Sequence, residues 1–285
     1  MQGAERPSRT PLTLFALNSP DAIKAYAYGC DADVGGTSTA HFEYDADPAR
    51  APPGKPGAAR FHGVMRLAVR PSYEERIRGG YAGFRNKVRE KKIKKMNGQD
   101  GTEMTPTCVC VCFATQFRPT LFGELTDDVS NHRFLALRVR AAGHPRTRGS
   151  YFVNVQTEGP TTDDLWQHRL YFTRDDGGWE DVFVRPCPLP FFWSFVRPTL
   201  AGAQIPFDGF VMTKAGTINT QPVSMLRERV RSVGVSLLGG NSGIEGPYEL
   251  GIDEIRAVNE EDVTVPPRTF PMSKSDFYCF PSMLL

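Results

Sequence analysis

The chain has 285 residues, of which 40% are hydrophobic and 23% are charged, as expected for a protein that buries a core. The 34 basic side chains nearly balance the 32 acidic ones, so overall charge argues against nucleic-acid binding. No apolar run approaches the ~20 residues that a membrane-spanning helix needs.

The start of the sequence, Met1 to Pro20, shows no secretory signal pattern, because its apolar stretch Leu12–Leu17 is short and is interrupted by Thr13. The flexible segment is expected to be residues 1–12. The basic and hydroxyl-bearing residues Arg6, Ser8 and Arg9 hint at an organelle-targeting remnant. We expect a flexible terminus here, which is the commoner state of a polar chain end.

Alternating apolar and polar residues predict half-buried strands over residues 13–262. The apolar sets are Ala40, Phe42 and Tyr44; Met65, Leu67 and Val69; Leu135, Leu137 and Val139; Tyr151, Val153 and Val155; Leu170 and Phe172; Val233, Val235 and Leu237; and Tyr248, Leu250 and Ile252. Apolar residues change parity after the last set, so a bulge is expected near Asp253–Glu254. Short helical turns are expected only at Tyr73–Arg78 and Ser224–Ser232. This pattern predicts a single all-β sandwich or barrel.

Three stretches interrupt the strands and are expected to be loop insertions, at 45–60, 87–106 and 185–204. The first is rich in proline, glycine and alanine and is expected to be a mobile excursion. A C-terminal extension, 263–285, is expected to pack on the domain. No long linker separates two apolar sets, so one domain with long loop insertions is the simplest organisation.

No catalytic or metal-binding pattern stands out in the sequence. Cys108, Cys110 and Cys112 alternate with valines, and alternate residues of a strand lie ~6.6 Å apart, too far to share one zinc ion easily. The histidines lack the i,i+4 spacing of a helical zinc site, and no Gly-x-Ser-x-Gly nucleophile pattern occurs. We therefore expect no catalytic residue, no metal and no cofactor, and a function in binding.

Two segments have the composition of a partner surface. The basic run contains Lys91, Lys92, Lys94 and Lys95, which could contact an acidic partner or an anionic membrane, or could be a solvated loop. The aromatic segment contains Phe191, Phe192 and Trp193, which could form an apolar contact patch or fold back onto the domain.

Several local patterns, in order along the chain, resemble the complex I intermediate-associated protein 30 family. They are Asp31-Ala32-Asp33-Val34-Gly35-Gly36-Thr37-Ser38, Ala59-Arg60-Phe61-His62-Gly63, Gly79-Gly80-Tyr81-Ala82-Gly83-Phe84-Arg85, Trp179 followed by Ile205-Pro206-Phe207, Val233-Gly234-Val235-Ser236, and Gly246 to Ile255. Each pattern is short, but their order and spacing together span most of the chain.

The resemblance implies a galactose-binding-like jelly-roll β-sandwich, here with long loop insertions. It also implies a non-enzymatic assembly factor (chaperone) on the matrix side of the mitochondrial inner membrane. The implied partners are an early membrane-arm intermediate of respiratory complex I and other assembly factors, in fungi a larger intermediate-associated protein. Peripheral contact with the inner membrane is compatible with the basic run, and nucleic acid is not an expected partner.

The glycine-rich pattern that ends at Arg85 is a further candidate contact site. Tyr81, Phe84 and Arg85 are residue types favoured at interfaces, but the two aromatic residues could equally be core. A carbohydrate-binding module with the same jelly-roll architecture is the alternative function, since fold alone does not decide between them. An enzyme with a spatially assembled site is a further alternative.

Overall fold

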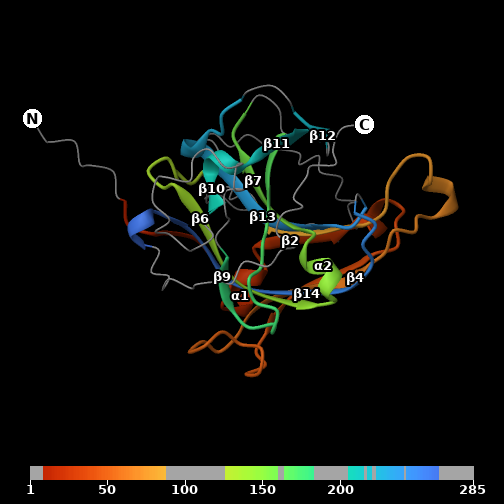
Figure 1. Cartoon of the computed structure of the whole chain (residues 1–285), viewed down its shortest axis with the longest axis horizontal. Coiled ribbons are helices and arrows are strands. Elements are labelled where there is room, and N and C mark those ends of the chain that lie inside the picture. The colour runs from red at the N-terminus through yellow and green to blue at the C-terminus, as the bar shows by residue number, and fades with distance from the viewer. Residues whose placement is uncertain are drawn as a thin grey trace, which may run out of the picture.

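The computed structural model describes residues 9–87, 126–159, 164–182, 205–214, 217–219, 223–240 and 242–262. In these ranges the chain forms strands and a few single-turn helices (Figure 1). The strands are β1 Leu12–Ala16, β2 Tyr26–Cys30, β3 Thr39–Asp45, β4 Ala58–Met65, β5 Tyr81–Asn86, β6 Phe134–Gly143, β7 Tyr151–Thr157, β8 Asp164–Arg169, β9 Glu180–Val182, β10 Ile205–Pro206, β11 Val211–Lys214, β12 Thr217–Ile218, β13 Val230–Leu238 and β14 Gly246–Val258.

The helical turns are short and lie in the connections between strands. They are α1 Pro20–Ile23 and α2 Pro145–Arg148, and the 3₁₀ turns η1 Asp31–Val34, η2 Pro71–Tyr73, η3 Phe207–Gly209, η4 Arg227–Arg229 and η5 Glu260–Asp262. Within the described ranges, none of these helices has the length and apolar character needed to span a membrane.

Two antiparallel sheets form the domain. Sheet A has the order β10-β6-β14-β4-β3, with β1 also paired to β14 and β9 to β6; sheet B has the order β12-β11-β8-β7-β13-β5-β2. The chain crosses between the sheets after β1, β2, β4, β5, β6, β8, β10 and β13. The prediction of an all-β sandwich is confirmed.

The core lies between the sheets and consists of the alternating apolar residues. From sheet A, the fully buried side chains include Phe61, Leu250 and Ile252, and sheet B contributes Val153 and Val235. Burying one such side chain stabilises a fold by about 1.5–3 kcal/mol. The alternation that predicted the strands is therefore the pattern that fills the core.

The expected bulge in the last strand is confirmed, and the pairing explains its position. The β14–β6 register shifts between Ile252 and Glu254. On its other side, β14 pairs with β4 up to Ile252 and with β1 from Glu254 onward. The strand thus changes neighbours at Asp253, and the bulge keeps Ile255 in the core after the change of parity.

Several expected boundaries were wrong. Leu67 and Val69 lie beyond the end of β4, and Leu170 and Phe172 follow the end of β8. The helical turns expected at 73–78 and 224–232 are single 3₁₀ turns, Pro71–Tyr73 and Arg227–Arg229. Short apolar alternations do not show where backbone pairing stops, because a side chain can stay partly buried just outside the sheet.

Residues at both ends of the first expected insertion belong to the sheet. Asp45 ends β3, and residues 58–60 begin β4. The intervening loop is held at two points: Arg50 pairs with Asp45 at 2.7 Å, and Lys55 pairs with the buried Asp253 at 2.6 Å. The insertions at 87–106 and 185–204 lie almost wholly outside the described residues, and the extension 263–285 lies outside them entirely.

The start of the domain is also held in place. His132 Nε2 lies 2.8 Å from the carbonyl oxygen of Thr10, and Asn259 Nδ2 donates to the carbonyl oxygen of Arg9 at 3.1 Å. Leu12 pairs with Ala257 in the sheet. Residues 9–12, expected to be part of a flexible segment, therefore contact the folded domain.

Ion pairs cover the outer face of sheet A around Glu249, which accepts hydrogen bonds from Arg60 and Arg140. Burial alone raises the pKa of Glu249, but the two guanidinium groups outweigh it and hold the pKa below its usual value. A depressed pKa makes the ionised carboxylate a source of stability, present at neutral pH and lost as the pH falls through the folded-state pKa.

We therefore expect Glu249→Gln to reduce the free energy of unfolding most at neutral pH. The difference between wild type and variant should shrink as the pH falls below about 4.5, the ordinary pKa of a glutamate. Urea unfolding at several pH values measures this difference. A difference that stays constant from pH 7 to pH 3 would rule out the proposed linkage.

Candidate functional site

A buried carboxylate, Asp31, joins three segments at one end of the sandwich. Its side chain accepts hydrogen bonds from the backbone N–H and the hydroxyl of Ser38, at 2.9 and 3.1 Å. It also accepts from the backbone N–H groups of Gly80 and Tyr81, at 2.5 and 3.3 Å. Asp31 is only 3% exposed. We call Asp31, Ser38 and Gly80 the Asp31 knot.

Glycine is required in the knot because its parts approach so closely. A Cβ atom on Gly36 would lie 2.3 Å from Cγ of Asp31. Gly80 has a φ of +92°, and a Cβ there would lie 2.5 Å from the backbone nitrogen of Gly240. Non-glycine residues rarely adopt this positive φ, so both steric space and backbone conformation select glycine at Gly80.

Residues 66–78 project from the knot and form what we call the arginine lobe, the orange segment at the right of Figure 1. Ser38 fixes its start, since the Arg66 N–H donates to the Ser38 hydroxyl at 3.0 Å. Arg70 N–H donates to the carbonyl oxygen of Gly35 at 2.9 Å. The Tyr73 ring packs so closely on Gly35 that a Cβ there would lie 2.5 Å from it.

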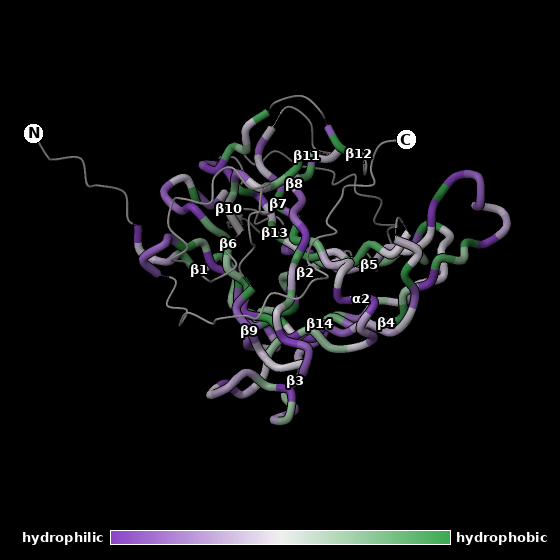
Figure 2. Tube along the Cα trace, in the orientation of Figure 1, coloured by the Kyte–Doolittle hydropathy of each residue, from purple (hydrophilic) through white to green (hydrophobic). Residues whose placement is uncertain are grey.

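The lobe carries exposed charge on its outer turn, which is hydrophilic in Figure 2. Arg66, Arg70, Arg76 and Arg78 are all exposed. Among the described residues, none of these four side chains has an ion-pair or hydrogen-bond partner. Several other cations of the domain are paired, such as Arg138, which lies 2.7 Å from Asp181.

A cleft of about 480 Å³ lies between the arginine lobe and the turn at Gly240. Its lining includes the apolar side chains of Leu67, Val69 and Ile77 and the charged side chains of Glu74 and Arg78. The cleft therefore combines an apolar wall with charged groups at its edge.

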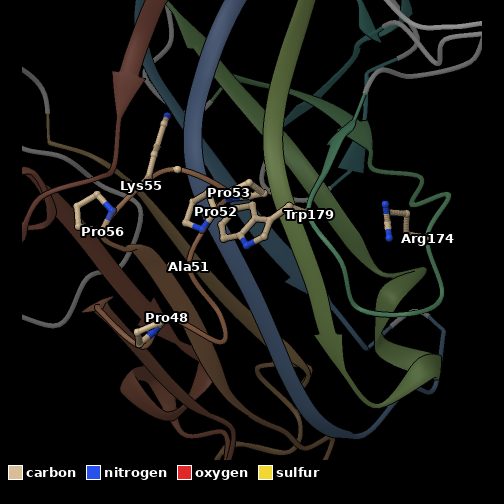
Figure 3. Close-up of a pocket in the computed structure, with 9 residues that line it drawn as sticks. Pro48, Ala51, Pro52, Pro53, Lys55, Pro56, Arg174 and Trp179 are labelled. Atoms are coloured by element: carbon tan, nitrogen blue, oxygen red, sulfur yellow. The ribbon is translucent and has the colours of Figure 1, made fainter.

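A second hollow, of about 450 Å³, lies between the loop 46–57 and Trp179 on the outer face of sheet A (Figure 3). The Trp179 indole N–H donates to the carbonyl oxygen of Arg50 at 3.0 Å, and its ring lies over Gly251. The two cations that line the hollow already have partners: Lys55 pairs with Asp253, and Arg174 pairs with Asp176. This hollow is thus less suited than the arginine lobe to hold a charged partner.

The structure separates the three residues predicted as a contact site on β5. Phe84 is 3% exposed and stacks on Phe42 with ring centroids 4.4 Å apart. The expected contact role of Phe84 is therefore wrong, because strand alternation directs its ring into the core. Tyr81 and Arg85 are half-buried on the opposite face of β5.

Tyr81 and Arg85 lie on the outer face of sheet B. Burial raises the pKa of the Tyr81 phenol and lowers that of the Arg85 guanidinium. Arg85 Nη1 donates to Oε1 of Gln156 at 3.5 Å, and the Ser232 hydroxyl donates to the same oxygen at 3.2 Å. Arg85 therefore belongs to a polar network across three strands, and a contact role for it and Tyr81 stays a prediction.

The remaining predicted contact residues lie outside the described part of the chain. They are Lys91, Lys92, Lys94, Lys95, Phe191, Phe192 and Trp193, and the same holds for Cys108, Cys110 and Cys112. Among the described residues, no group of three or more His, Cys, Asp or Glu side chains is arranged to hold a metal ion.

Sequence reasoning missed the arginine lobe. A usable signal was present, because four arginines and a tyrosine occur within thirteen residues, 66–78, and both residue types are enriched at binding hot spots. The alternation of Met65, Leu67 and Val69 instead favoured a strand there. The cleft is also lined by Gly240, which is distant from the lobe in sequence, so sequence patterns did not predict this contact.

Comparison with known proteins finds similarity to one family. The family model described as "Complex I intermediate-associated protein 30 (CIA30)" matches residues 15–107. A curated relative, "Complex I intermediate-associated protein 30, mitochondrial" of Neurospora crassa, is 29% identical over 266 residues, covering 88% of this chain and 75% of the relative. The resemblance to the complex I intermediate-associated protein 30 family is confirmed.

One solved structure, titled "Structural analysis of an exo-beta-agarase", aligns with a TM-score of 0.41 and 9% sequence identity. The alignment covers 90% of this chain but 25% of that chain. This chain therefore corresponds to about a quarter of the length of that protein.

The structure shows what some residues of the sequence patterns that resemble the family do. The Asp31 knot joins Asp31 and Ser38 of one pattern to Gly80 of another, and Gly36 packs against the Asp31 side chain. The residues that carry the resemblance here are therefore structural, and they fix the base of the arginine lobe.

Proposed function

We propose that this chain is a non-enzymatic assembly factor for mitochondrial respiratory complex I. It binds an early membrane-arm intermediate, together with other assembly factors, on the matrix side of the inner membrane. The observation that carries the proposal is the 29% identity to complex I intermediate-associated protein 30 over 88% of the chain. The family match over residues 15–107 agrees with it.

The geometry supports a role in binding. Two sheets with a continuous core provide a rigid scaffold, and loops at the end of such a scaffold are common recognition elements. The arginine lobe is such an element, held by the Asp31 knot and rich in exposed, unpartnered guanidinium groups among the described residues.

Native-gel analysis of mitochondria that contain a tagged chain tests the proposal. We expect the tag to migrate with membrane-arm subunits in a complex smaller than complete complex I, and to be absent from the complete enzyme. A tag found solely at the size of the free monomer would contradict the proposal. Binding of the purified chain to soluble glycans, without such co-migration, would favour the carbohydrate-binding alternative.

A further inference from the structure

We propose that the arginine lobe is a docking site for an acidic segment of a partner protein. Carboxylates of that segment pair with the lobe arginines, and an adjacent apolar side chain enters the cleft beside Leu67 and Ile77. The inference deepens the proposed function, and it rests on that function for the setting in which the partner is met.

The charge of the lobe supports an acidic partner. Residues 66–78 contain four arginines against two acidic residues, Glu74 and Glu75. Guanidinium groups match carboxylates in a two-point geometry that lysine lacks. In the described domain, carboxylates already pair with cations such as Arg60, Arg138 and Arg256. The lobe arginines, with no such partner among the described residues, are available to carboxylates from another molecule.

The cleft favours a protein over a lipid surface as the binding partner of the lobe. It is an open hollow of about 480 Å³ whose lining includes Leu67, Val69 and Ile77, so it offers apolar contacts to a side chain. Glu74 lines the same cleft, and Glu75 is the next residue in the sequence. A flat anionic membrane would repel these carboxylates, whereas a polypeptide can place its charges to match both signs.

The lobe is also positioned before binding. Its start is joined to Ser38 and its middle to Gly35, through Arg66 N–H and Arg70 N–H. Ala68 adds a third attachment, since its carbonyl oxygen accepts from the Thr37 hydroxyl at 2.7 Å. A prepositioned surface loses less conformational entropy on binding, so a few exposed charges can contribute usefully to affinity.

Charge reversal on the purified full chain tests the inference. The probe is a fluorescein-labelled peptide with Leu-Phe flanked by glutamates, and binding is followed by fluorescence anisotropy. We expect R66E/R78E to weaken binding at least about tenfold, equivalent to ~1.4 kcal/mol, and R66Q/R78Q to weaken it less. Thermal unfolding of each variant should match the wild type, because these side chains are exposed.

The matched control is R146E/K214E, which reverses two exposed cations that also lack a side-chain partner among the described residues. It should bind the acidic peptide within about twofold of wild type, and a peptide with glutamines in place of glutamates should bind none of the proteins well. Equal binding by wild type and R66E/R78E, or no binding by either, would overturn the inference.

Two further arms separate the alternatives. Vesicles with one-fifth anionic phospholipid should bind wild type and R66E/R78E equally; lobe-dependent vesicle binding without peptide binding would assign the lobe to the membrane and overturn the inference. In mitochondria, R66E/R78E should lose co-migration with membrane-arm subunits while the wild type keeps it. If the wild type itself does not co-migrate, the proposed function fails, and the peptide result still decides the chemistry of the lobe.

Discussion

Asp31→Asn is expected to lower the free energy of unfolding by about 3–5 kcal/mol, because it places an amide among donors. In the wild type, the two carboxylate oxygens accept four hydrogen bonds from Ser38, Gly80 and Tyr81. An asparagine of the same shape directs an N–H group toward some of these N–H groups. Each buried donor left without an acceptor costs about 1–3 kcal/mol. Urea unfolding of the purified chain measures the loss.

The same substitution should loosen the arginine lobe. Hydrogen exchange at residues 66–78 should become faster, since Ser38 anchors both Asp31 and the start of the lobe. Asp21→Asn is the control, because Asp21 forms an exposed pair with Lys24 and such pairs contribute little. If Asp31→Asn unfolds at the same urea concentration as wild type, the knot does not hold the fold together.

Phe84→Ala is expected to lower the free energy of unfolding by about 3–5 kcal/mol, the range for removing a buried aromatic ring. The Phe84 ring contacts Phe42, and it also lies 5.2 Å from the Phe61 ring, centroid to centroid. Its removal therefore leaves a cavity where the two sheets meet. Chemical unfolding measures the loss, and Phe84→Leu should lose less because it fills part of the space.

This substitution also distinguishes a core residue from a contact residue. A core role predicts that the fraction of Phe84→Ala that remains folded binds partners as the wild type does. If Phe84→Ala kept the stability of the wild type but lost partner binding, Phe84 would be a contact residue rather than a core residue. The matched control is Val211→Ala on β11, because Val211 is 45% exposed and its truncation should change stability by no more than about 0.5 kcal/mol.

The sandwich could be predicted because the apolar residues of its strands follow a local, periodic pattern in the sequence. Tyr151, Val153 and Val155 occupy alternate positions of one strand and lie in the core as expected. The bulge at Asp253 could be predicted for the same reason, since a parity change is visible in sequence. By contrast, the end of β4 at Met65 could not, because Leu67 continues the alternation while its chain leaves the sheet.

The candidate site depends on contacts between distant residues, and periodicity does not encode them. The side chain of Asp31 binds Gly80 across 49 positions of sequence, and Gly240 lines the cleft beside Ile77. The sequence pattern around Asp31 indicated the resemblance to the family, but it did not show that the Asp31 carboxylate holds a loop. Phe84 was ambiguous because an aromatic residue near a glycine-rich pattern suits a core as well as an interface.

Removing the gene for this chain and measuring assembled complex I by in-gel activity, with another respiratory complex as the internal standard, tests the proposed function most directly. We expect a marked loss of complete complex I alone, which the wild-type chain restores and R66E/R78E restores poorly. A normal amount of complete complex I without the chain would contradict the proposed function.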